Sequence, residues 1–177
     1  QHEIDPHSEL DLIQNIDFGN IASSFLGGIG DYVQLFEPTA SQFEKDGIGQ
    51  IVASFGEESG LVPYTVFMAK ETFIEEHPET ILKFTRAIYR AQQYVQETDP
   101  VEIAKIVQPF FEDTDLDLLT NSVERYKKQG SYAPTPLLEE SAWEHLKAIM
   151  DQADELPADI PYQDLVNTDF AEEVIDQ

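Results

Sequence analysis

Hydrophobic and polar residues alternate along four segments within the first 69 residues. A period of two places successive side chains on opposite faces of an extended chain, so these segments are predicted to be β-strands. Helical spacing separates the first strands, over Phe18–Leu26 and again over Ala40–Lys45, which ends at Gly47. This order predicts an α/β fold with a small, mainly parallel sheet flanked by helices. The predicted strands are Glu9–Ile16, Tyr32–Phe36, Ile48–Phe55 and Val62–Ala69.

The period changes to that of helices after Glu71. His77-Pro78 and Asp99-Pro100 are typical helix starts, because proline is favoured in the first turn. Thr114 or Asp115 is expected to cap a further helix, and the apolar residues after Asp159 indicate a tail that docks on the rest. We therefore expect two parts, residues 1–69 and a helical part 70–177. The predicted helices are Pro78–Glu97, Val101–Phe111, Leu116–Gln129 and Leu137–Leu156.

Composition limits the classes of partner. The net charge of −25, from 35 acidic and 10 basic residues, makes binding to nucleic acids or anionic membranes unfavourable. The chain has no cysteine, which excludes disulfides, thiolate metal sites and cysteine nucleophiles. No apolar run approaches the ~20 residues that cross a bilayer. Because the sequence starts at Gln1 without methionine, we expect a fragment or a mature piece.

The segment Asp31–Pro38 is the strongest candidate for a binding site. Alternation places Tyr32, Gln34 and Phe36 on one side of the predicted strand. Glu37 follows at the carboxyl end of that strand, where open α/β sheets place ligands. The alternative is that Glu37 faces solvent or caps the following helix.

Other candidate chemistry is weaker. Asp113, Asp115, Asp117 and Glu124 match positions of a calcium loop, but Leu118 occupies the position that requires glycine. The alternative is an acidic helix N-terminus. The pair Glu57-Glu58 has no nucleophile nearby and is expected to be a solvated loop. The histidines show no metal-ligand spacing, so no metal or cofactor is expected; they are His2, His7, His77 and His145.

Several motifs in order resemble the second lobe of the substrate-binding proteins of ABC importers. The similar group is the one for nitrate, sulfonates, taurine and pyrimidine precursors of thiamine. There, a helix, a Gly-x-x-Asp step and a strand ending in an aromatic–acid–Pro run recur. The resemblance covers nearly the whole chain. The matching segments are Phe25–Tyr32, Phe36-Glu37-Pro38, Tyr64–Ala69, Phe73 with His77-Pro78-Glu79, and Ile160–Asn167.

The resemblance implies binding without catalysis. A small polar or heteroaromatic molecule would be held between two lobes of a periplasmic-binding-protein type II fold and offered to a membrane permease. This chain would supply the second lobe and the C-terminal part, with the first lobe absent. The family further implies an extracellular or periplasmic protein, attached through a lipid anchor or through the permease.

Ligand chemistry follows from the candidate residues. Tyr32, Phe36 and Tyr64 are expected to stack on a planar ligand, with Gln34 beside them. Glu37 is expected to accept hydrogen bonds from ring amino groups and to repel sulfonate or nitrate. An amino-bearing heterocycle such as a pyrimidine precursor of thiamine is therefore favoured.

Two other classes stay open. The first is an enzyme of the related pyrimidine-synthesising branch, in which a cysteine-rich motif is expected. The second is an acidic interaction module that binds no small molecule. We also expect the chain to associate with itself or with another chain through apolar surface that a missing lobe would cover.

Overall fold

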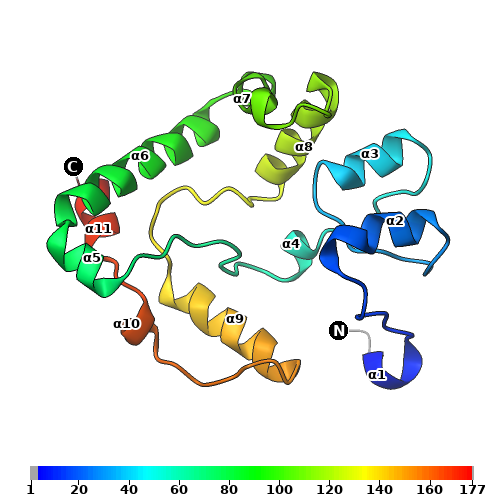
Figure 1. Cartoon of the computed structure of the whole chain (residues 1–177), viewed down its shortest axis with the longest axis horizontal. Helices are drawn as coiled ribbons and strands as arrows, with labels where there is room; N and C mark the ends of the chain where they lie inside the picture. Colours follow the sequence, from blue (N-terminus) through cyan, green and yellow to red (C-terminus); the bar gives the residue numbers. More distant parts are fainter. Residues whose placement is uncertain (1–3, 177) are drawn as a thin grey trace. The chain divides into compact units, whose positions relative to one another are not determined.

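The computed structural model describes residues 4–176, and helices are the regular secondary structure within that range (Figure 1). The predicted α/β fold with a parallel sheet, and with it the type II lobe, is wrong, because no described residue belongs to a strand. The chain divides into two compact units between Val52 and Ala53. The predicted division after residue 69 stays a prediction.

None of the four predicted strands forms backbone hydrogen bonds with a neighbouring strand in the described part of the chain. Glu9 closes helix α1 (Pro6–Glu9), and the residues from 10 to 17 that follow it are irregular. Phe55 begins helix α4 (Phe55–Glu58), so the loop expected around Glu57-Glu58 contains a helical turn. The two remaining predicted strands are irregular throughout. Alternation predicts which side chains share a face, but a strand also requires a partner for its backbone hydrogen bonds.

The first unit is built from short helices. Rings of Phe25 and Phe43 stack with their centroids 6.3 Å apart, which joins the second and third α-helices of this unit. Gly28 has a φ of 88°, a left-handed conformation that lets the chain turn back after Leu26. Besides α1, this unit contains η1 (Phe18–Asn20), α2 (Ile21–Leu26) and α3 (Thr39–Lys45).

The second unit contains the longer helices. Besides α4, its helices are α5 (Glu71–Glu76), α6 (Pro78–Glu97), α7 (Pro100–Val107), α8 (Leu116–Lys128), α9 (Glu140–Gln152), α10 (Tyr162–Leu165) and α11 (Asp169–Ile175), with the 3₁₀ turn η2 (Gln108–Phe110) after α7. Helix α7 packs on α8, α11 packs on α6, and α10 lies against α9.

Buried hydrophobic residues of the described chain all belong to α7, α8 and α11. Their spacing within each helix places them on one face, as expected for an amphipathic helix. They are Ile103, Ala104, Leu118, Leu119, Val123, Ala171 and Val174.

Polar contacts fix the ends of helices in the second unit. The ammonium of Lys127 in α8 donates to the carbonyl oxygens of Val95 (2.7 Å) and Thr98 (2.6 Å) at the end of α6. Tyr162 in α10 donates its hydroxyl to the carbonyl of Leu138, and burial raises the pKa of this phenol. The C-terminal segment is thus tied to the helices before it.

Several helix predictions are confirmed. Helix α6 has the predicted bounds, and Asp115 is the N-cap of α8, accepting from the backbone N–H of Leu118 at 2.8 Å. The tail docks as predicted, because α11 packs on α6. The helix predicted over Leu137–Leu156 is shorter, since it begins at Glu140 and ends at Gln152. None of the described helices is long and apolar enough to span a bilayer.

Candidate functional site

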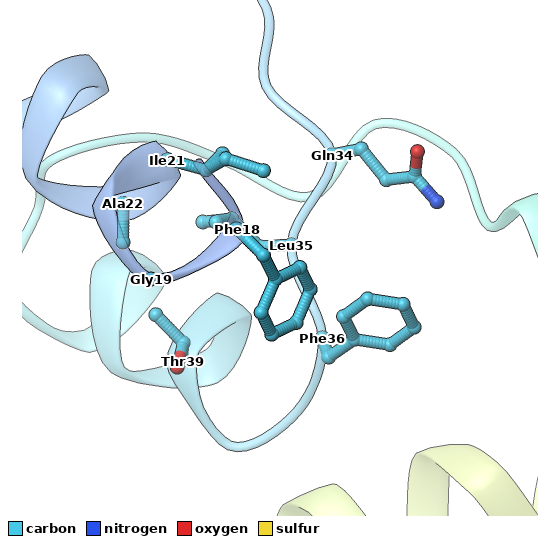
Figure 2. A pocket seen from close by; sticks show the side chains of 8 residues that line it. All are labelled: Phe18, Gly19, Ile21, Ala22, Gln34, Leu35, Phe36 and Thr39. Atoms are coloured by element: carbon cyan, nitrogen blue, oxygen red, sulfur yellow. The ribbon is translucent and has the colours of Figure 1, made fainter. Parts of the chain in front are cut away.

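The first unit contains a pocket of about 220 Å³ between η1, α2, the segment before Pro38 and the start of α3 (Figure 2). Its lining combines two aromatic rings, small and aliphatic side chains, one carboxamide and one hydroxyl. The lining residues are Phe18, Gly19, Ile21, Ala22, Gln34, Leu35, Phe36 and Thr39.

An aromatic pair forms one wall of the pocket. The rings of Phe18 and Phe36 have centroids 5.7 Å apart and are tilted by 50°. This separation lies within the range in which aromatic rings attract one another. Phe36 is partly buried, whereas Phe18 is exposed, so the wall has a face open to solvent. Such a wall can cover one side of a small planar molecule.

Gln34 lies on the same side of the segment as Phe36. Figure 2 shows both side chains leaving the segment in one direction, as expected for residues two apart in an extended stretch. Gln34 is exposed, and its carboxamide presents both a hydrogen-bond acceptor and donors. The hydroxyl of Thr39, at the first position of α3, is the other polar side chain of the lining.

Glu37 is directed to α3. Its Oε2 accepts from the backbone N–H of Ser41 at 3.1 Å, which places negative charge at the positive end of this short helix. Glu37 does not line the pocket, and its peptide bond to Pro38 is cis. The geometry matches the alternative in which Glu37 serves the following helix.

The predicted site residues are only partly brought together. Gln34 and Phe36 line the pocket, whereas Tyr32 is 83% exposed and lies outside the lining. Tyr64 is exposed and belongs to the second unit. The roles predicted for Tyr32, Tyr64 and Glu37 stay predictions.

Sequence reasoning missed the contribution of the helix before the segment. The sequence pattern places Phe18 on a predicted helix, but its approach to Phe36 spans a turn whose geometry that pattern does not specify. The available signal is the set of aromatic residues on either side of the glycine-rich turn, Phe18 and Phe25 before it and Tyr32 and Phe36 after it, and this set does not single out Phe18 and Phe36.

The other candidate chemistry does not assemble within residues 4–176. Among the side chains that the structure describes, no three carboxylates or imidazoles come together as metal ligands. Asp115 of the calcium-like pattern caps α8, and Leu118 and Leu119 are buried in that helix, as in the alternative interpretation. His145 contacts the carbonyl oxygen of Ser59 at 2.6 Å, and His2 lies outside the described residues.

Residues 1–108 match the NMT1-like family. The chain belongs to this family, which is part of the substrate-binding group of ABC transporters. It is also 58% identical, over 174 residues, to a protein of Bacillus subtilis (strain 168) named "Putative binding protein YtlA". The family and the name of this relative point to a binding role without catalysis. No solved structure matches the chain.

The chain is shorter than this relative. The match covers 98% of the chain but 52% of the relative, so the chain spans about half of the relative's length. The ligand and the partners of the whole protein are therefore proposals for this chain.

Proposed function

We propose that the chain is part of a substrate-binding protein that captures a small, planar heteroaromatic solute for an ABC importer. The observation that carries the proposal is the pocket of the first unit, with the Phe18–Phe36 ring pair beside a carboxamide. Family membership supports the transport role. A pyrimidine of the kind that serves as a thiamine precursor is the favoured solute, ahead of sulfonates and nitrate.

The pocket chemistry supports this order of ligands. A volume of about 220 Å³ lies below the ~300–1,000 Å³ of typical ligand pockets, which favours a ligand as small as a single ring. The lining contains no cationic side chain that would compensate an anion. Removing a sulfonate or nitrate from water would therefore cost free energy without a matching partner. A neutral ring, in contrast, gains from contact with the two phenylalanine rings.

The proposal includes partners and location. A membrane permease would receive the solute, and the protein would act outside the cytoplasmic membrane, held by the permease or by a lipid anchor. Association with itself or another polypeptide also stays a prediction, supported by the exposed apolar residues of the second unit, among them Leu61, Phe67 and Met68.

Ligand-observed NMR tests the binding role, because it detects weak complexes of small molecules. An open pocket on a single unit should bind 4-aminopyrimidine with a dissociation constant of about 1 mM, which corresponds to about −4 kcal/mol. Phe36→Ala should weaken this binding at least fivefold, because it removes half of the aromatic wall.

Phe110→Ala is the matched control, since Phe110 is exposed in the second unit and lies outside the pocket. Phe110→Ala should leave the binding of 4-aminopyrimidine unchanged. Taurine or nitrate, added as a competitor to the unchanged chain, should not displace 4-aminopyrimidine. Equal binding by Phe36→Ala and the unchanged chain would exclude this pocket as the site.

A further inference from the structure

The lining of the pocket contains no ionisable side chain. Its polar groups are the carboxamide of Gln34 and the hydroxyl of Thr39, and both are neutral at every physiological pH. A charged ligand group inside the pocket would lose hydration without gaining an opposite charge. The lining therefore favours an uncharged ligand.

Glu37 follows the lining residue Phe36 directly in the sequence, but its carboxylate serves the next helix. Its carboxylate accepts from the backbone of Ser41 in α3, and the residue is absent from the lining. The side-chain hydrogen-bonding groups of the lining thus come from Gln34 and Thr39. Of these two, only Gln34 presents a donor and an acceptor side by side on one planar group.

A carboxamide pairs best with a ligand edge of the reverse pattern. Glutamine can accept from an exocyclic amino group through its oxygen and donate from its nitrogen to a neighbouring ring nitrogen, as glutamine and asparagine do with adenine. The amino group and adjacent ring nitrogen of a 4-aminopyrimidine form this edge. Gln34 lies on the same side as Phe36, so one ligand can contact the ring and the carboxamide together (Figure 2).

We infer that Gln34, and not Glu37, determines specificity in this pocket, and that the ligand is an uncharged aminoheterocycle whose amino group and adjacent ring nitrogen meet the Gln34 carboxamide. The inference rests on the proposed binding function and deepens it. Glu37 acts as a positioning residue that holds the start of α3, whose first residue, Thr39, lines the pocket.

The test compares 4-aminopyrimidine with pyrimidine, which has the same ring but no amino group. Dissociation constants are measured by ligand-observed NMR titration on the full chain. The unchanged chain should bind the amino compound about tenfold more tightly, which corresponds to about 1.4 kcal/mol. Gln34→Met keeps the length of the side chain and removes both hydrogen-bonding groups, so this preference should disappear. Gln34→Glu replaces the hydrogen-bond donor by a charged acceptor and should weaken the binding of both compounds.

Two comparison variants complete the design. Gln50→Met alters another exposed glutamine of the same unit that does not line the pocket, and it should keep the preference. Glu37→Gln should also keep it, because Glu37 does not line the pocket and a glutamine oxygen can still accept from the backbone N–H of Ser41. Circular dichroism checks that the helical content of each variant is unchanged.

The outcomes separate this inference from the proposed function. If Phe36→Ala weakens the binding of both compounds while Gln34→Met keeps the preference for the amino compound, the assignment of Gln34 is wrong, and the pocket remains the binding site. A loss of the preference in Glu37→Gln alone would return specificity to Glu37. If neither ring binds the unchanged chain, the proposed function fails, and the inference fails with it.

Discussion

The two compact units of the chain differ in how they bury hydrophobic residues. In the second unit, α7, α8 and α11 present buried isoleucine, leucine, valine and alanine side chains to their neighbours. In the described part of the first unit, the one buried residue is polar, Ser41. This contrast shows that helices alone do not make a core, because stability comes from apolar area removed from water.

The difference in hydrophobic burial also bears on where the candidate site lies. The candidate pocket belongs to the unit without a buried hydrophobic core, where the aromatic side chain of Phe18 is exposed beside a turn. Regions with few buried apolar contacts open at low free-energy cost, and binding elements are commonly drawn from them. The second unit supplies the packed helices and the first unit supplies the candidate site.

The largest expected effect comes from truncating a core leucine of α8. Leu119 is 3% exposed, so Leu119→Ala should lower the free energy of unfolding by about 2–5 kcal/mol. Leu26→Ala is the control in the first unit, where Leu26 is 60% exposed, and it should change stability by no more than about 0.5 kcal/mol. Urea denaturation measures both values. Equal costs would show that the first unit has a core of comparable strength.

A smaller effect is expected where α8 meets the end of α6. Lys127→Met keeps the aliphatic stem but removes the ammonium that donates to three carbonyl groups, those of Val95, Gln96 and Thr98. Because these charge-assisted bonds are only partly buried, the expected loss is about 1–2 kcal/mol. Lys128→Met alters the exposed neighbouring lysine and should cost little. A matching loss in both variants would mean that charge on α8, and not the helix-end contact, is responsible.

The smallest effect concerns the two buried serines, one in each unit. Ser122 is 4% exposed and donates to the carbonyl of Leu118 at 2.9 Å, so Ser122→Ala should cost up to about 1 kcal/mol. Ser41 is 5% exposed, and its hydroxyl has no hydrogen-bond partner within the described residues. Ser41→Ala should therefore leave stability unchanged or raise it slightly. Both serines lie in helices, so the gain in helix propensity from alanine is common to the two variants. A larger loss for Ser41→Ala would reverse this part of the comparison.

The sequence predicted the helices whose signals are local. Pro78 at a first helical position and Asp115 as an N-cap mark helix starts that the structure confirms. Both signals act within one helical turn. An N-cap side chain accepts from a free N–H group of the first turn, and a proline there has no N–H group that needs a partner, whatever surrounds the helix. The apolar face of α8 could be read from spacing for the same reason.

Only the tertiary structure decided what became of the alternating segments and of the candidate site. Whether residues 32–36 form a strand depends on a partner that no local pattern specifies, and none of the described residues supplies one. The approach of Phe18 to Phe36 and the direction of the Glu37 carboxylate toward Ser41 likewise depend on how the chain turns between them. Alternation and spacing assign faces along the chain, but which faces meet is determined by contacts between segments distant in sequence.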